Sequence, residues 1–302
     1  MTAPRDQADA DRVVDLLCAW INRQSSIDEV DWLRARQAEI EKGAPDWKFF
    51  TAFSAAPRHL SKEDLDLSAS DLSDAARLRA GWTPEGWSVD EAARTVLLLS
   101  YPCDERERYV AALDQLFSTA DTRESIALYQ VLPLYPHPDA FRARAAEGLR
   151  SNMTSVFNAV AHENPYPKEY LDQAAWSQMV LKALFVGSVL YRIQGLDERA
   201  NAELARMLVD FARERWAAHR SVPPELWRPV GPFADDELAE EIGTLLESDS
   251  VVEREAAALA LADARSEAAS ALLSQQPELK RRLESGELSW ESFSRNRIPI
   301  AA

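Results

Sequence analysis

The chain has 302 residues, of which 46% are hydrophobic, and it contains only 9 glycines. This hydrophobic share supports a packed core and excludes a disordered chain, while the shortage of glycine disfavours the tight turns of β-rich folds. The formal net charge of −16 repels phosphate groups, so we expect neither nucleic acid nor an anionic membrane as a partner. Alanine, leucine, glutamate and arginine are abundant, and because all four suit helix interiors, we expect an all-α fold.

Two features of the sequence bear on its redox state and location. Cys18 and Cys103 are the only cysteines, and their spacing matches no zinc motif, so we interpret them as reduced, structural thiols. We expect no metal site and no cofactor. The N-terminal segment is polar and acidic rather than signal-like, and no apolar run reaches the ~18 residues of a membrane span. The sequence therefore predicts a cytoplasmic protein without direct membrane insertion.

Helix start signals and apolar spacing predict helices along almost the whole chain. The capping-box spacing occurs in Ser26 with Glu29 and Ser88 with Glu91, and in a looser acidic form in Asp121 with Glu124. Apolar residues at three- and four-residue steps predict helices over 9–23, 27–42, 46–55, 70–80, 89–100, 104–118, 122–132, 139–149, 151–161, 171–194, 197–219, 235–247, 250–263 and 265–275. No segment alternates polar and apolar residues for long enough to predict a strand.

Two interruptions suggest a division into three parts. "TPEGWS" (83–88) is a loop, and "VPPELWRPVGPF" (222–233) has four prolines, so it cannot be an ordinary helix. We expect N-terminal helices over 1–82, a central helical region over 83–234, and a C-terminal helical pair with a tail over 235–302. The pair, "SDSVVEREAAALALADARSEAASALL", resembles one HEAT-type repeat, although no fixed period is present. The predicted architecture is an irregular helical bundle or a HEAT-like α-solenoid.

The stretch "HENPYPKEYLDQAAWSQMVLKALFVG" (162–187) interrupts the helical pattern and then resumes it with an apolar run. Pro165 and Pro167 bias Asn164 and Tyr166 toward extended geometry, which predicts a rigid, non-helical arm with an aromatic side chain at its middle. Two interpretations are open. The arm is either a binding loop, or a connector between helices with Tyr166 packed on the core.

The predicted helix over 171–194 is apolar around most of its circumference, so we expect it to be buried. Gln178 and Lys182 are four residues apart and therefore share one face. A buried ammonium needs a carboxylate, a cluster of carbonyls or an anionic ligand. The alternative is that Lys182 reaches a nearby edge or forms a structural ion pair.

A polar stripe precedes the arm. Its members follow steps of three, four, four and four: Glu147, Arg150, Thr154, Asn158 and His162. One interpretation is the wet face of an amphipathic helix. The other is that the stripe faces Gln178 and Lys182 across the arm, with Glu147 as the partner of Lys182.

Enzyme motifs are poorly represented. The chain has no G-x-S-x-G, P-loop or G-x-G-x-x-G motif, and its four histidines are scattered. The acidic cluster at 235–241 only partly matches a Mg²⁺ motif, and the preference of a helix N-terminus for negative charge explains it better. Arg199 and Asn201 are second-tier candidates because they lie near the start of the predicted helix over 197–219.

Residues 46–234 resemble the EboA family of bacterial and algal proteins. The resemblance rests on "RAAEGLRSNMTSVFNAV", "NPYPKEYLDQAAWSQMVLKALFVG", "GLDERANAELARMLVDFARERWAAHR" and "PELWRPVGPF". It implies traffic of small-molecule precursors toward the cell envelope, in an operon with a UbiA-type prenyltransferase and several putative enzymes. It implies no catalytic residues. Ser177 and Ser188 stand where many relatives are expected to have Asn and Arg, which would alter the polarity of a pocket.

Together these arguments predict a set of ligand-binding candidates. They are Glu147, Arg150, Asn152, Asn158, His162, Asn164, Tyr166, Trp176, Gln178 and Lys182, with Arg199 and Asn201 in second place. We expect a protein that binds a metabolite or operon-encoded partner proteins rather than a catalyst. Two alternatives stay open: an all-α enzyme of secondary metabolism that uses Lys182 with Glu147 or His162, and a scaffold that docks the operon's other enzymes.

Overall fold

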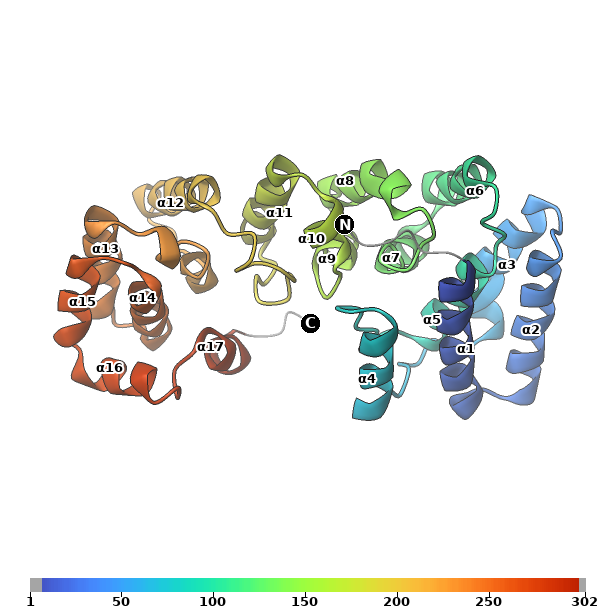
Figure 1. Cartoon of the computed structure of the whole chain (residues 1–302), viewed down its shortest axis with the longest axis horizontal. Helices are drawn as coiled ribbons and strands as arrows, with labels where there is room; N and C mark the ends of the chain where they lie inside the picture. The colour runs from blue at the N-terminus through green and yellow to red at the C-terminus, as the bar shows by residue number, and fades with distance from the viewer. Residues whose placement is uncertain (1–6, 299–302) are drawn as a thin grey trace. The chain divides into compact units, whose positions relative to one another are not determined.

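The computed structural model describes residues 7–298, and within them the chain is helical with no β-strand (Figure 1). By its contacts the chain divides into two compact units, unit 1 (Met1–Asp172) and unit 2 (Gln173–Ala302). The all-α prediction is confirmed. Between residues 7 and 298, no helix combines the length and the apolar character that crossing a membrane requires.

Unit 1 consists of helices whose starts largely follow the sequence signals. In chain order they are α1 (Gln7–Gln24), α2 (Ile27–Glu41), α3 (Asp46–His59), α4 (Ala69–Leu78), α5 (Val89–Leu99), α6 (Arg106–Thr119), α7 (Thr122–Gln130), α8 (Arg142–Arg150), α9 (Thr154–Ala161) and α10 (Tyr166–Tyr170). The three predicted capping boxes are confirmed at the starts of α2, α5 and α7. Ser68 and Asp71 form a further one before α4.

Helix α5 lies at the centre of unit 1. It packs against α1, α2, α3 and α7, and every residue in it except Glu91 is buried. Its two buried charges neutralise each other, because Arg94 Nη1 lies 3.1 Å from Asp90 Oδ2. Arg94 Nε also donates to the carbonyl oxygen of Phe53 on α3, 3.2 Å away. The helix that is buried on all sides is therefore α5, whereas the sequence assigned that position to 171–194.

Unit 2 is organised around α14. Its helices are α11 (Gln173–Val186), α12 (Ala202–Ala217), α13 (Asp236–Gly243), α14 (Val251–Asp263), α15 (Glu267–Ser274), α16 (Pro277–Glu284) and α17 (Trp290–Arg297). Helix α14 packs against α13, α15, α16 and α17. Buried Glu255 on α14 accepts hydrogen bonds from Arg282 Nη1 and Arg297 Nε, both at 2.8 Å, and thereby ties α16 and α17 to the centre.

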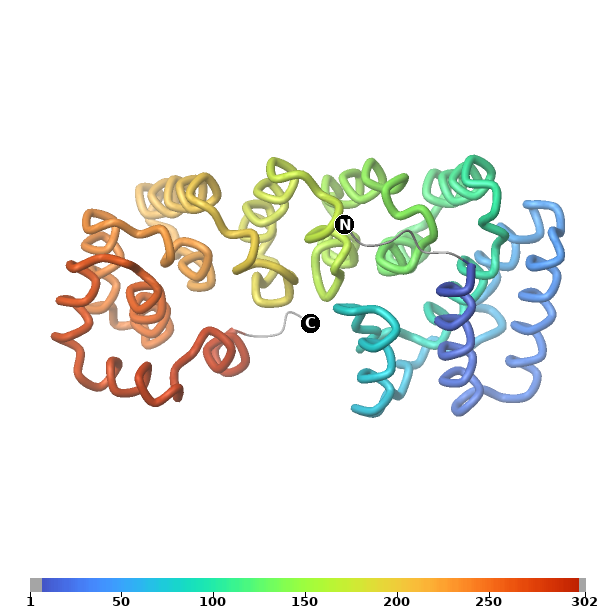
Figure 2. The backbone as a smooth tube through the Cα atoms, viewed as in Figure 1, coloured from blue at the N-terminus to red at the C-terminus, as the bar shows by residue number. Residues whose placement is uncertain are grey.

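Several predicted helix bounds in unit 2 are wrong. The helix predicted over 171–194 ends at Val186, because Gly187 has a φ of 76° and Ser188 N donates to Ala183 O in a Schellman motif. Turns follow (Figure 2), and the helix predicted over 197–219 begins only at Ala202, after Asn201 caps it. The predicted helix over 235–247 ends at Gly243 and continues as a 3-10 turn, Thr244–Glu247. Helices α16 and α17 were not predicted.

The proline-rich segment over 222–233 contains no α-helix, as expected, and instead makes the 3-10 helices Pro224–Trp227 and Gly231–Phe233. Helices α14 and α15 confirm the two helices predicted after residue 248, and they pack against each other. Their HEAT-like character and the solenoid arrangement stay predictions, as does the division at 82 and 234.

Gly231 provides a test of the packing on α14. A Cβ atom built there would lie 2.6 Å from the backbone oxygen of Ala260, and backbone in a buried helix cannot move aside. We expect Gly231→Ala to lower the free energy of unfolding by about 1–3 kcal/mol, which chemical denaturation measures. The matched control is Gly243→Ala, whose Cβ would meet only the movable side-chain tip of Leu272 at 2.7 Å. That change should stay within about 1 kcal/mol of the wild type, since alanine also favours the helix. Equal effects would contradict the packing argument.

The buried ion pairs of Glu255 provide a pH test. Burial alone would raise the pKa of Glu255, but hydrogen bonds from Arg297 and Arg282 outweigh it and lower the pKa below its usual value. Because the folded-state pKa is the lower one, this contribution to stability is present above the unfolded pKa and is lost as the pH falls through the folded pKa. We expect Glu255→Gln to lower the free energy of unfolding by about 1–3 kcal/mol at pH 7. The ion pair with Arg297 contributes the smaller part, because solvent screens this partly exposed side chain. Unfolding curves should show this difference shrinking below about pH 4; a difference independent of pH would contradict it.

Candidate functional site

The arm after α9 is a tightly bonded connector. Asn164 is buried, and its amide donates to the carbonyl oxygens of Tyr129 and Ala159, both at 3.1 Å, while its Oδ1 accepts from the backbone N–H of Tyr166. Tyr166 begins the short helix α10, so the predicted extended, non-helical arm is wrong at this residue. Asn164 accepts from an N–H group in the first turn of α10, and Pro165 and Pro167 stand at the N-cap and the second position, where a helix needs no N–H donor.

Tyr166 is fully buried, and its hydroxyl donates to the carbonyl oxygen of Pro138 at 2.6 Å. Its ring stacks on Tyr170 with centroids 4.7 Å apart, and burial raises the pKa of its phenol. These contacts favour the connector interpretation. A role for Tyr166 in ligand binding stays a prediction.

The predicted polar stripe does not lie on one helix. Glu147 and Arg150 belong to α8, whereas Thr154 and Asn158 belong to α9, and the break at 151–153 interrupts the helical spacing. Glu147 pairs with Arg144 at 2.8 Å, and Arg144 also binds Asp114 at 2.6 Å. The stripe argument fails because its step counting assumed one continuous helix.

The other polar candidates of unit 1 lie toward the surface. Arg150 and Asn152 are exposed, and Asn158 and His162 are half-buried. The wet-face interpretation describes the exposed members. The binding roles assigned to all of them stay predictions.

Helix α11 has one buried face and one exposed face, so the prediction of a helix buried all round is wrong. Trp176 is buried, but Gln178 is exposed and Phe185 on the same side is 77% exposed. The residues on the exposed side follow steps of four and seven and therefore share one face. Because the apolar Phe185 is among them, the apolar composition of the helix did not reveal this face. Lys182 is half-buried on that side, and burial lowers the pKa of its ammonium.

Arg199 is brought to the start of α11. Its guanidinium lies 4.6 Å from the centroid of the Trp176 ring, and it donates to Gln173 at 3.2 Å. Asn201 instead caps α12 by accepting from the backbone N–H groups of Glu203 and Leu204. Ser177 and Ser188 are both buried. Glu147 belongs to unit 1 and Lys182 to unit 2, so their pairing stays a prediction.

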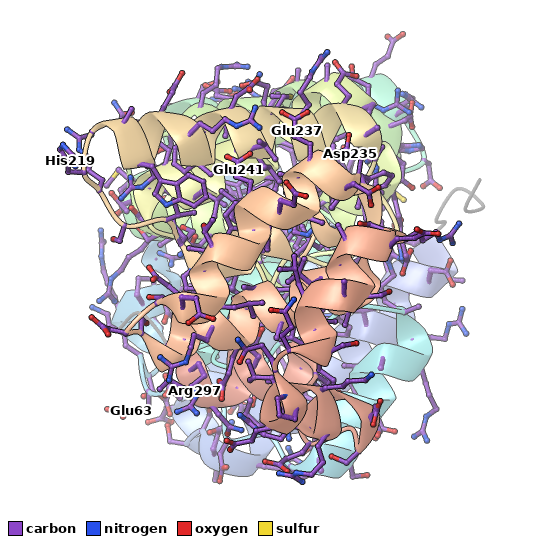
Figure 3. The ribbon with its side chains drawn as sticks, turned by 90° about the vertical axis from the view of Figure 1, so that its left-hand side faces the viewer. Glu63, His219, Asp235, Glu237, Glu241 and Arg297 are labelled. Atoms are coloured by element: carbon purple, nitrogen blue, oxygen red, sulfur yellow. The ribbon has the colours of Figure 1, made fainter. Side chains whose placement is uncertain are left out.

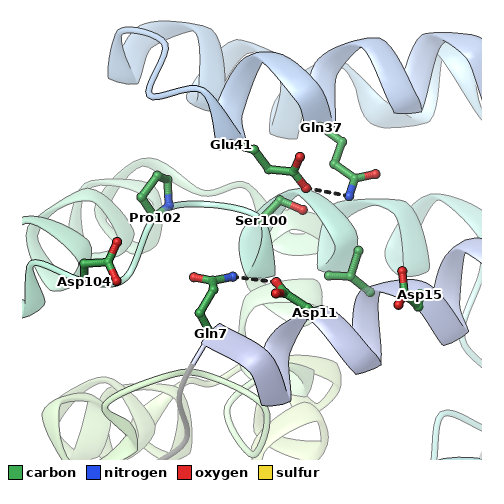
Figure 4. Close-up of a pocket in the computed structure, with 9 residues that line it drawn as sticks. Gln7, Asp11, Asp15, Gln37, Glu41, Ser100, Pro102 and Asp104 are labelled. Carbon is green, nitrogen blue, oxygen red and sulfur yellow. Dashed lines mark hydrogen bonds between the residues drawn. The ribbon is translucent and has the colours of Figure 1, made fainter.

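A pocket in unit 1 contains none of the predicted residues. It has a volume of about 480 Å³ and lies among α1, α2 and the segment after α5 (Figure 4). The described residues that line it are Gln7, Asp11, Val14, Asp15, Gln37, Glu41, Ser100, Pro102 and Asp104. We call it the acidic pocket, because four of these residues, Asp11, Asp15, Glu41 and Asp104, have carboxylate side chains. Its volume is in the range that small-molecule sites occupy, ~300–1,000 Å³.

Two glutamine amides organise the walls of the acidic pocket. Gln7 Nε2 donates to Asp11 at 2.9 Å, and Gln37 Nε2 donates to Glu41 at 2.8 Å (Figure 4). The amide donors are therefore engaged with carboxylates. Carboxylate oxygens are left as the dominant groups on both walls, and they can only accept hydrogen bonds when ionised.

Both cysteines adjoin the acidic pocket. Cys103 Sγ lies 3.0 Å from Gln7 Oε1, and Cys18 Sγ lies 3.9 Å from Gln37 Oε1. Burial raises the pKa of Cys18 to about 11, and the charges of Asp15 and Glu41 add to that rise. The high pKa keeps Cys18 a thiol at neutral pH, which agrees with the structural role expected for it.

Ser100 is the buried polar group of the acidic pocket. It caps the C-terminus of α5, is only 5% exposed, and its Oγ has no hydrogen-bond partner in the part of the chain that the structure describes. Figure 4 shows its hydroxyl directed into the space between the Gln37–Glu41 pair and Asp11. A buried hydroxyl without a partner loses about 1–3 kcal/mol of hydrogen-bond stabilisation, which a ligand atom would restore.

The sequence did contain a signal for the acidic pocket. Gln7, Asp11 and Asp15 are spaced by four, and so are Gln37 and Glu41, which places each set on one helix face. Acidic stripes are usually solvated surface, so the pattern alone does not mark a site. Only the packing of α1 and α2 on α5 brings the two stripes together with Ser100.

A smaller groove of about 280 Å³ lies between α12 and α13 in unit 2. Its charges are mixed, and Arg213 pairs with Glu241 at 2.5 Å. Figure 3 shows Asp235, Glu237 and Glu241 along α13 beside α12. Asp235 accepts from the backbone N–H of Leu238 as the N-cap, and Asp236 accepts from Ser266. Asp235, Asp236 and Glu237 of this acidic cluster therefore lie at the N-terminus of α13, where the sequence suggested that a helix start attracts negative charge.

Comparison with known proteins places these helices in a family. Neither the curated proteins nor the solved structures gave a match. The family model described as metabolite traffic protein EboA matches residues 13–231, which include α2, α5 and most of the acidic pocket but begin after Gln7 and Asp11. This match spans most of the chain and agrees with the resemblance noted from the sequence, so the chain belongs to the EboA family of metabolite traffic proteins.

Proposed function

We propose that the protein takes part in metabolite traffic by binding a small molecule in the acidic pocket and releasing it chemically unchanged. The observation that carries the proposal is the pocket itself, which is preformed, about 480 Å³ in volume and lined by acceptors from three parts of unit 1. The family description supports the link to metabolites. Preformed concave sites with a few convergent polar groups are typical of small-molecule binding.

Binding is favoured over catalysis because the suggested catalytic groups are already engaged or exposed. Glu147, the proposed partner of Lys182, is exposed and bound to Arg144. A general base must lie within hydrogen-bond reach of the proton that it abstracts, and its pKa must be adjusted by its surroundings. The operon-encoded partner proteins and prenyltransferase stay part of the proposal as recipients of the ligand.

The first test asks whether the pocket retains a ligand from the host. We expect the purified wild type to carry a small molecule that native mass spectrometry detects, and Gln37→Trp to lack it, because the indole fills the pocket. The matched control is Ala35→Trp, on the same helix but exposed and outside the pocket lining, which should retain the ligand. Equal small-molecule content in all three proteins would contradict the proposal.

The second test separates the acidic pocket from the region around Lys182. We expect Lys182→Met to retain the same ligand as the wild type, because Lys182 is not part of the acidic pocket. Ligand content measured by native mass spectrometry decides the question. Loss of the ligand from a folded Lys182→Met variant would move the site to α11 and would favour the alternative built on that lysine.

A further inference from the structure

We propose that the acidic pocket binds an aliphatic diamine or polyamine, with its ammonium groups distributed among the carboxylates of α1, α2 and the segment after α5. This inference rests on the proposed function and names the class of its ligand. It follows from the charge of the pocket, the helix ends that meet it, and the buried hydroxyl at its wall.

The charges of the pocket are of one sign. Four carboxylates line it, on Asp11, Asp15, Glu41 and Asp104, and the described lining residues include no lysine, arginine or histidine. None of these carboxylates forms an ion pair with another residue of 7–298. Like charges around one cavity repel one another, so a bound cation lowers the electrostatic energy of the pocket itself.

Two helix ends increase the negative potential. The C-terminus of α5 borders the pocket, where Leu99 O accepts a long, 3.4 Å hydrogen bond from Gln7, and α2 ends at Glu41. Helix C-termini carry a partial negative charge that basic residues usually offset. Neither last turn contains a basic residue, and Lys42, which follows α2, does not line the pocket.

Ser100 supplies an acceptor of a different kind. Its Oγ is buried, lacks a partner and is directed into the pocket, so it can accept a hydrogen bond from an ammonium N–H. A hydroxyl at the pocket wall and carboxylates at both sides match a chain of N–H donors.

The arrangement of the carboxylates favours separated charges over a single metal ion. Asp11 and Asp15 lie on α1, Glu41 on α2 and Asp104 after α5, and within residues 7–298 no group of three or more His, Cys, Asp or Glu residues is placed to hold a metal ion. A metal ion needs its ligands at one point, at distances of ~2.0–2.6 Å. Ammonium groups a few bonds apart on a flexible chain instead match acceptors on several elements.

The experiment titrates the full-length protein with spermidine by isothermal calorimetry at low ionic strength. We expect saturable binding that weakens about five- to tenfold in Asp15→Asn, the loss of one charge-assisted hydrogen bond at a partly exposed site. Asp31→Asn is the matched control, since Asp31 is also exposed, lies on α2 and is not part of the pocket lining. Equal affinities of the two variants would show only general attraction to an acidic protein and would overturn the proposal.

Ser100→Ala tests the buried hydroxyl. Because Ser100 Oγ has no partner in the described chain, we expect the melting temperature of the unliganded variant to stay the same or rise, while spermidine affinity falls. Unchanged affinity would remove the one buried group that points to a ligand and would overturn the proposal. A parallel titration with MgCl₂ should show no comparable site, and a Mg²⁺ affinity equal to that of spermidine would likewise overturn it.

The two proposals fail separately. Absence of spermidine binding, together with a host ligand that Gln37→Trp loses and Ala35→Trp retains, would overturn the amine class and leave the binding function in place. Equal ligand content in those variants would overturn the binding function itself.

Discussion

Helix α5 is the constraint on which unit 1 depends, because it is buried on every side. A helix in that position needs apolar neighbours around its whole circumference, and α1, α2, α3 and α7 provide them. Its two buried charges must be satisfied inside the core, which the Asp90–Arg94 pair and the Phe53 carbonyl achieve. The end of this buried helix also forms part of the wall of the acidic pocket, because its C-cap residue Ser100 lines the pocket.

Most of the helices could be predicted from the sequence, but how deeply each helix is buried could not. Capping pairs such as Ser88 and Glu91 act within one turn, so the chain alone identifies them. Both α5 and α11 are apolar, and periodicity gives no reason to bury one more than the other. The difference arises from long-range packing: α5 has partners on all sides, whereas Phe185 of α11 remains exposed. Gly187 was a usable local signal for the end of α11, because glycine commonly follows a helix in a left-handed conformation.

The predicted site residues were chosen by chemistry and spacing, and the structure gives several of them a structural explanation. Asn164 and Tyr166 stabilise a turn between helices, and Asn201 caps α12. Caps and connectors use the same polar and aromatic residues that binding sites use, so sequence alone cannot separate the two roles. The acidic pocket escaped prediction for the opposite reason: its residues look like ordinary solvated faces until α1 and α2 are placed beside Ser100.

The residues that line the acidic pocket differ in how strongly the core of unit 1 determines their positions. Ser100 is attached to the buried helix α5, and its position follows from the core of the unit. Asp11, Asp15 and Glu41 lie on the exposed faces of α1 and α2, where a substitution changes the charge of the pocket without changing the packing. The family match begins after Gln7 and Asp11, so one wall of the pocket lies partly outside the region that defines the family. A substitution at these exposed positions therefore alters the charge of the pocket while the packing around α5 stays in place.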